Sequence, residues 1–205
     1  MDAGARAVQA CHDLLVELAG RLPDELQWRL RDWLAAEAAT SAAPDTVSVL
    51  LPRELMRNRV GLTDHERDLL SDAAGGWGPA RRLLDAVLPV HVPAEPAFSF
   101  VADPEPTDAA MLSLLAVVRD HPGCTELSVA RRTGGGRDQR VVLVRGGARP
   151  WGLAATLQRI LRAHGDRNPC VEVLPDGTTP AYHRAAAAAA APVWSDAREL
   201  APVAS

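Results

Sequence analysis

The stretch TELSVARRTGGGRDQRVVLVRG, residues 125–146, predicts two β-strands joined by a tight turn. Residues 125–132 alternate between apolar and polar, as a half-buried strand does, and residues 140–146 are almost continuously apolar, as a covered strand is. The glycines between them supply the positive φ that a hairpin turn needs. The pattern therefore predicts an antiparallel hairpin closed by Gly134–Gly136.

The segments around this hairpin complete an α/β region. Its expected elements are a strand at 97–102, a helix at 108–123, the two hairpin strands, a helix at 151–165, a strand at 170–175 and an alanine-rich helix at 180–194 with Thr179 as its N-cap. The order β-α-β-β-α-β is that of the ferredoxin-like fold, whose first and third strands are central. We therefore expect a ferredoxin-like region with an extra terminal helix.

The first ~90 residues predict helices. Apolar residues recur at spacings of three and four in 4–20 and in 22–38, where Leu26, Leu30, Trp33 and Leu34 form the expected apolar face. Residues 46–60 are compatible with a strand or with a helix interrupted at Pro52. Thr63-Asp64-His65-Glu66 predicts a capping box at a helix start, and another short helix is expected near Pro79.

A composition shift marks the boundary between these regions. The segment 91–96 is proline-rich, and proline can neither continue a helix nor donate to a sheet. The sequence thus predicts an α+β protein with a helical region at 1–90, a linker at 91–96, the ferredoxin-like domain at 97–194 and a tail at 195–205.

Composition excludes several chemistries. All 22 basic residues are arginine, so there is no lysine for a Schiff base, for pyridoxal phosphate or for a P-loop. The three cysteines are odd in number and far apart, which favours buried thiols in a reducing cytoplasm over disulfides or a zinc site. The N-terminus lacks the pattern of a secretory signal, and no apolar run is long enough for a membrane span. We predict a cytoplasmic location, with no cofactor and no metal.

Basic charge is concentrated around the hairpin. Residues 1–120 carry 11 arginines and 19 acids, a balance of −8, whereas residues 121–205 carry 11 arginines and 7 acids, a balance of +4. The favoured interpretation of 131–140 is a turn, and the alternative is binding of nucleic acid or another anion through phosphates, because strand 140–146 has no aromatic residue for base stacking. The arginines assigned to that alternative are Arg131, Arg132, Arg137, Arg140, Arg145 and Arg149. The strand-to-helix loop 145–156 is a further anion-site candidate.

Catalytic motifs are absent from the sequence, so the leading hypothesis is a non-enzymatic interaction or regulatory protein that binds another protein. Five tryptophans stand against two phenylalanines and one tyrosine. Trp28 and Trp151 are the candidates for a partner surface. A small enzyme with a pocket near Tyr182 and His183 is the remaining alternative.

Two segments, 21–38 and 157–186, carry a resemblance to a family of actinobacterial proteins. Members of that family have a helical N-terminal half, a short proline-containing connector and an α/β C-terminal half. The resemblance implies this fold for the chain and implies no activity, cofactor or catalytic residue.

Overall fold

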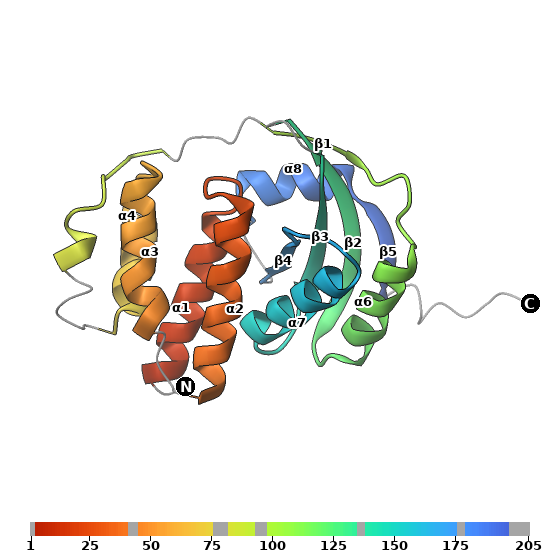
Figure 1. Cartoon of the computed structure of the whole chain (residues 1–205), viewed down its shortest axis with the longest axis horizontal. Coiled ribbons are helices and arrows are strands. Elements are labelled where there is room, and N and C mark those ends of the chain that lie inside the picture. Colours follow the sequence, from red (N-terminus) through yellow and green to blue (C-terminus); the bar gives the residue numbers. More distant parts are fainter. Residues whose placement is uncertain are drawn as a thin grey trace, which may run out of the picture. The chain divides into compact units, whose positions relative to one another are not determined.

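A computed structural model describes residues 3–40, 45–75, 82–92, 98–134, 138–175 and 179–196. The chain divides into two compact units, Met1–Pro96 and Ala97–Ser205. It is a mixed α and β protein, with helices in its N-terminal half and the strands in its C-terminal half (Figure 1). Most of the predicted linker, and the predicted tail beyond residue 196, lie outside the described residues.

The first unit is helical. Its helices are α1 (Ala3–Glu17), α2 (Asp24–Thr40), α3 (Asp45–Arg57) and α4 (Asp64–Ala73). Most of the ambiguous segment 46–60 is therefore helix. α3 contains Pro52, which cannot donate a helical hydrogen bond. Val47, Leu51 and Leu55 recur every four residues and are fully buried, so packing of this stripe outweighs the proline.

The predicted capping box starts α4 and is confirmed. The Glu66 amide donates to the Thr63 hydroxyl (3.3 Å), and the Thr63 amide donates to the Glu66 carboxylate (2.8 Å). Glu66 also forms a buried ion pair with Arg21, which connects α4 to the turn between α1 and α2. The helix expected near Pro79 begins outside the described residues.

The second unit contains the sheet. Its elements are β1 (Ser99–Ala102), α6 (Ala109–Asp120), β2 (Cys124–Thr133), β3 (Gln139–Gly146), α7 (Pro150–Ala163), β4 (Cys170–Leu174), α8 (Ala181–Ala189) and β5 (Ala191–Ser195). The predicted element order β-α-β-β-α-β followed by a helix is confirmed. The predicted hairpin is also confirmed, because β2 and β3 pair antiparallel. Gly134 has a φ of 102°, while residues 135–137 lie outside the described part.

The strand order corrects the ferredoxin-like expectation. In that fold the first and third strands are central, whereas here the neighbours are β1-β2-β3-β4, so β2 and β3 are central. β4 runs parallel to β3, to which it is connected through α7. β1 has four mostly exposed residues and pairs with β2, as suits an edge strand.

The end of the predicted helix 180–194 is also corrected. α8 ends at Ala189, and residues 191–195 form β5, which pairs antiparallel with β2. Pro192 explains the change, because proline disrupts a helix interior but is tolerated in an edge strand. The N-cap of α8 is Pro180 and not Thr179.

Helices cover both faces of the sheet (Figure 1). Strand side chains alternate between the faces. On the α6–α7 face the apolar core includes Met111, Leu114, Leu127, Val129, Val142, Val144, Leu157, Val171 and Val173. On the opposite face, Tyr182 of α8 contacts Arg132 of β2 and Phe100 of β1.

Candidate functional site

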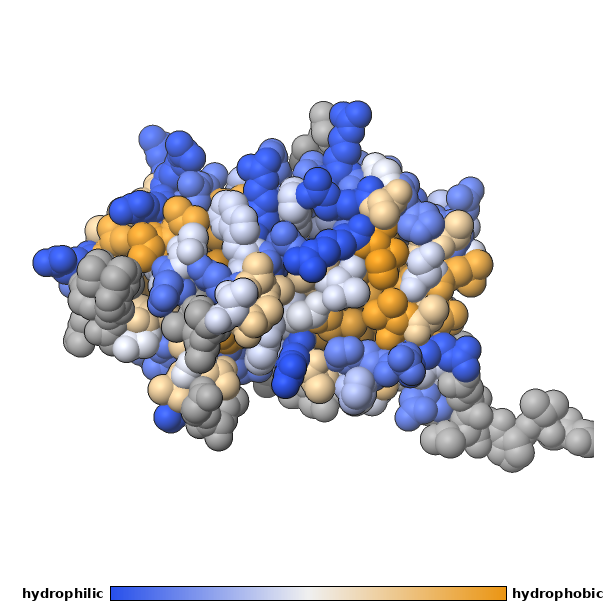
Figure 2. Space-filling view, turned by 60° about the horizontal axis from the view of Figure 1, so that its bottom comes forward, coloured by the Kyte–Doolittle hydropathy of each residue, from blue (hydrophilic) through white to orange (hydrophobic). Residues whose placement is uncertain are grey.

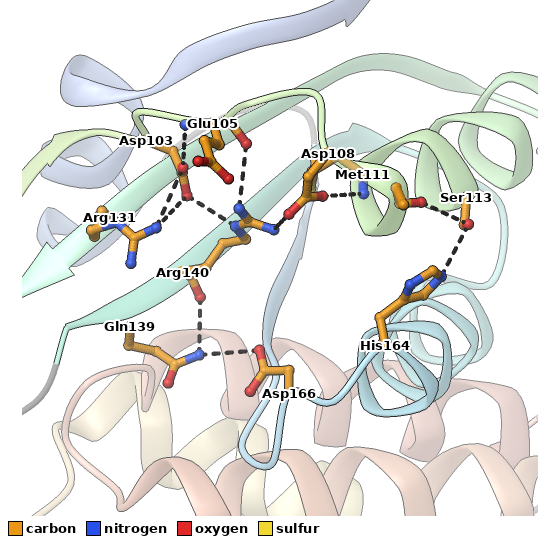
Figure 3. A network of polar contacts seen from close by, with 11 residues as sticks. Asp103, Glu105, Asp108, Met111, Ser113, Arg131, Gln139, Arg140, His164 and Asp166 are labelled. Carbon is orange, nitrogen blue, oxygen red and sulfur yellow. Dashed lines mark hydrogen bonds and ion pairs between the residues drawn. The ribbon is translucent and has the colours of Figure 1, made fainter.

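Two arginines and two aspartates form an ion-pair network where β1 leads into α6 (Figure 3). Arg140 of β3 donates from Nε to Asp103 (2.9 Å) and from Nη1 to Asp108 (2.6 Å). Arg131, which lies opposite Arg140 in the β2–β3 register, donates to both carboxylate oxygens of Asp103 at 3.4 and 3.3 Å. The Asp103 side chain has no exposed surface, so these cations neutralise a buried carboxylate.

The network perturbs the protonation of its members. Burial by itself raises the pKa of Asp103. Hydrogen bonds and the positive charge of Arg140 lower that pKa by more, so the net pKa lies below the usual 3.8. The pKa of Asp108 is lowered in the same way, because the Met111 amide and Arg140 together outweigh burial. Burial lowers the pKa of Arg140, and its two carboxylate partners raise it by more. Asp103, Asp108 and Arg140 are therefore all charged at neutral pH, and their ion pairs hold residues 103–108 against the sheet.

Arg132 is not a surface cation. It is 5% exposed, its Nη1 donates to the Tyr182 hydroxyl (3.1 Å), and its guanidinium lies 4.4 Å from the ring centroid of Phe98. Anion binding needs arginines that face solvent, but Arg132 is buried and the Arg140 side chain is 16% exposed and paired with Asp103.

The other predicted arginines are placed differently. Arg145 pairs with Glu126 at 3.3 Å and is partly exposed. Arg149 is exposed at the start of α7, with a φ of 51°. Arg137 lies outside the described residues. Among the described members of the predicted set, Arg131, Arg132 and Arg140 are held by contacts within the protein, whereas Arg145 on β3 and Arg149 before α7 are more exposed.

The loop before α7 uses its amides internally. The Gly147 amide donates to the Gly123 carbonyl and the Ala148 amide to the Pro122 carbonyl, both at 2.9 Å. A Cβ at Gly146 would lie 2.2 Å from the Gly123 carbonyl oxygen, so only glycine permits this close approach. Amides that already donate in this way are not directed at an external anion.

A buried polar cluster lies between α8 and the sheet. His183 of α8 contacts the Glu172 carboxylate of β4 at 3.0 Å, and the Cys170 thiol lies 3.7 Å from the other oxygen of Glu172. Cys170 also lies 3.8 Å from the hydroxyl of Tyr182. Sequence analysis singled out Tyr182 and His183, but it missed Cys170 and Glu172 because nothing local links β4 to a helix eleven residues later.

The cluster lacks the direct thiol–imidazole contact of a cysteine–histidine pair. His183 Nε2 contacts Glu172, and the Cys170 sulfur contacts Glu172 and Tyr182. Burial, reinforced by Cys170, raises the pKa of Tyr182 well above its usual range, so this hydroxyl stays neutral. In the part of the chain that the structure describes, no group of three His, Cys, Asp or Glu residues could hold a metal ion.

A serine–histidine pair joins α6 and the end of α7 (Figure 3). Ser113 Oγ lies 3.2 Å from His164 Nε2, but the same hydroxyl donates to the Ala109 carbonyl at 2.9 Å. Because the serine proton is directed at the backbone, His164 is not positioned to remove it. The pair is a contact between two helices.

A groove lies between α2 and α3 in the helical unit. Its volume is about 360 Å³, and its walls are formed by Pro23, Glu25, Leu26, Arg29, Leu30, Trp33, Leu50, Glu54, Arg57 and Asn58. Apolar residues of both helices line it, and one ion pair lies on each helix. Glu25 pairs with Arg29 at 2.6 Å, and Glu54 pairs with Arg57 at 3.2 Å.

Trp33 is more exposed than Trp28 and Trp151, the two tryptophans that the sequence favoured as a partner surface. It is 41% exposed, although its helical spacing predicted a place on the buried face of α2. Trp28 and Trp151 are only partly exposed, and the Arg29 guanidinium lies 5.7 Å from the Trp28 ring centroid. The helical period was correct, but the buried stripe of α2 is displaced from the predicted one and consists of Gln27, Leu30, Arg31 and Leu34.

Other exposed apolar side chains are scattered. On the face drawn in Figure 2, apolar side chains gather in separate patches bordered by charged ones. The large exposed ones besides Trp33 are Met56, Leu88, Val92, Val101 and Leu112. Of these residues, Trp33 is the one that lines the α2–α3 groove.

Comparisons with protein-family models, with curated proteins and with solved structures find no match to the chain. The resemblance carried by 21–38 and 157–186 therefore stays a prediction. Within the described residues, no helix combines the length and the apolar character that a bilayer crossing requires.

Proposed function

We propose that the chain is a non-enzymatic protein-binding protein, and that the groove between α2 and α3 takes an amphipathic helical segment of its partner. The observation that carries this proposal is Trp33, which is 41% exposed at the wall of a groove of about 360 Å³. A large aromatic beside a groove is the kind of residue that dominates binding energy in protein interfaces.

The shape of the groove favours a helix over an extended peptide. Two helices joined by a short connection form its walls, and a third helix can pack its apolar face between them. Leu26, Leu30 and Leu50 supply apolar surface for such a face. The wall of α2 from Glu25 to Trp33 contains nine residues, and the eight steps of 1.5 Å between them span about 12 Å, which matches two turns of a partner helix.

The charged rim suits a partner with charges of both signs. Both side chains of the Glu25–Arg29 pair are about half exposed. Such exposed pairs contribute roughly 0–1 kcal/mol, so they can exchange partners at little cost. The rim would then set the register of the bound helix, while Trp33 and the leucines supply most of the binding energy.

An affinity pull-down with the full chain tests the proposal. Wild type, Trp33→Ala and Leu112→Ala are compared on the same native lysate by quantitative mass spectrometry. Leu112 is 56% exposed on α6, so its substitution is a matched loss of exposed apolar surface outside the groove. We expect a protein retained by wild type and Leu112→Ala and lost with Trp33→Ala, and its purified segment should bind directly in calorimetry. Equal recovery with all three baits, or no reproducible protein, contradicts the proposal.

Nucleic-acid binding has less support in the geometry, because Arg132 and Arg140 already have partners within the protein. It would now rest on Arg145, Arg149 and the undescribed Arg137. Anisotropy titration with short DNA and RNA at low salt tests this alternative, since phosphate binding weakens steeply with added salt.

An enzyme acting near Tyr182 and His183 also has less support. These residues are 6% and 0% exposed, so a substrate cannot reach their polar atoms in this conformation.

A further inference from the structure

The sheet face opposite the α6–α7 core buries polar side chains beside apolar ones such as Val141 and Leu143. Arg132 projects from β2, Cys170 and Glu172 project from β4, and they are 5%, 6% and 1% exposed. Burying such groups stabilises a fold less than apolar residues of similar volume would. The polar contacts of the covering helix therefore add little net stability, and its main apolar contacts are those of the Tyr182 ring with Phe98 and Phe100.

α8 itself makes few apolar contacts. Of its nine residues, only Tyr182, His183 and Ala186 are buried. The printed sequence of the helix is AYHRAAAAA, so the side chains after its first turn are alanines. Tyr182 and His183, which contact Arg132 and Glu172, both lie in that first turn. Beyond this turn the helix is attached by little more than methyl groups.

The ends of α8 add little stability. Its N-cap is Pro180, and no side chain caps the helix there. No acidic residue lies in the first turn and no basic residue lies in the last turn, so the helix dipole is not offset at either end. A helix of nine residues is marginal in water without tertiary packing. Low local stability of this kind allows a segment to open while the rest of the domain stays folded.

We propose that α8 is a lid over these polar side chains: it unfolds locally and leaves the sheet, exposing Arg132, Cys170 and Glu172, while the strands β1–β4 stay folded. The core on the α6–α7 face is separate and contains no α8 residue, so the sheet keeps its main apolar layer when the lid opens. Opening breaks the contacts of Tyr182 and His183, and the Cys170 thiol, now 6% exposed, becomes accessible to solvent.

Thiol labelling of the full chain tests the lid. Cys11, Cys124 and Cys170 are all free and buried, so one experiment with N-ethylmaleimide and peptide mass spectrometry follows three sites. The test variant is Ala185→Gly with Ala188→Gly, because both alanines are exposed on α8 and make no part of its buried face. Each change lowers helix propensity and multiplies the open population by about five, hence roughly twenty-five-fold for the pair.

Ala116→Gly is the matched control, since Ala116 is an exposed alanine of α6 on the opposite face of the sheet. We expect the double variant to raise the labelling rate of Cys170 by roughly twenty-five-fold and to leave Cys11 and Cys124 unchanged, while Ala116→Gly leaves Cys170 unchanged. A second variant, Tyr182→Phe, removes one lid contact without altering helix propensity and should also accelerate Cys170 alone. The lid is overturned if Cys170 labelling does not respond to the α8 variants, or if the three cysteines accelerate together as they would in global unfolding.

Discussion

At the residue scale, Arg140 links three parts of the second unit. It lies on β3, and its guanidinium reaches Asp103 after β1 and Asp108 at the N-cap of α6. Asp108 meanwhile accepts the Met111 amide at 2.9 Å, so one side chain caps α6 and binds the sheet. An arginine that the sequence offered as a candidate for anion binding therefore positions a helix.

Replacing Arg140 should destabilise the fold. Arg140→Gln leaves the buried carboxylate of Asp103 with Arg131 at 3.3 Å as its remaining cation. We expect a loss of about 2–3 kcal/mol in the free energy of unfolding, the range for hydrogen bonds to charged groups. Urea denaturation followed by circular dichroism measures it. Arg149→Ala, at an exposed arginine, should change stability by less than about 0.5 kcal/mol, and equal losses in both variants would contradict this role.

The same network predicts a pH dependence. The pKa values of Asp103 and Asp108 are lowered in the folded state from the usual 3.8. A lowered folded pKa gives stability that is complete above the unfolded value and is lost as the pH falls through the folded value. The stability difference between wild type and Arg140→Gln should therefore be constant at neutral pH and shrink as the pH falls below about 3.8, through the lower folded pKa values of Asp103 and Asp108. A difference that stays constant below that pH would show that the two carboxylates do not depend on Arg140.

At the element scale, the start of α4 shows what local sequence can specify. Thr63 and Glu66 are three residues apart, and both bonds of the capping box form between them. Thr63→Ala should lower the free energy of unfolding by about 1 kcal/mol. Thr156→Ala is the control, because the Thr156 hydroxyl is exposed and donates to the Gly152 carbonyl within α7. Similar losses of stability for the two substitutions in thermal denaturation would show that the capping box is not what Thr63→Ala weakens.

The elements that sequence reasoning missed depend on distant residues. Hairpin strands and helices were predictable because their periodicity and turns lie within about twenty residues. β5 was missed because the alanine run before it favours helix, although Pro192 marked the end of that helix, and its strand partner β2 lies some sixty residues away. The place of β1 at the edge is likewise set by pairing and not by its own pattern.

The candidate sites were less predictable than the fold. The Arg-rich stretch was visible in the sequence, but Asp103 and Asp108, which neutralise Arg140, lie more than thirty residues away. The α2–α3 groove needs two helices to pack at a particular rotation. A helical period shows which residues of α2 are apolar and does not show that its neighbours bury the polar Gln27 and Arg31 instead of Trp33.

At the scale of the whole molecule, the two units have separate cores. Leu14, Leu15 and Leu30 are fully buried in the first unit, and Leu127, Val129 and Val142 are fully buried in the second. The division falls between Pro96 and Ala97, beside a proline-rich stretch of the kind that separates domains. A unit that has its own core is expected to fold without the other.

Expressed separately, residues 1–96 and 97–205 should each unfold in one cooperative transition, and the sum of their far-ultraviolet circular dichroism spectra should match the spectrum of the full chain.

The substitution Thr63→Ala makes this test specific to one unit. It should shift the transition of fragment 1–96 by the free energy lost in the full chain, because the capping box and its Arg21 contact lie within that unit. Arg140→Gln should act only on fragment 97–205, because Asp103, Asp108 and Arg131 all lie there. If either fragment lacks a cooperative transition, that unit depends on the other for its fold, and the two substitutions would then shift a single shared transition of the full chain.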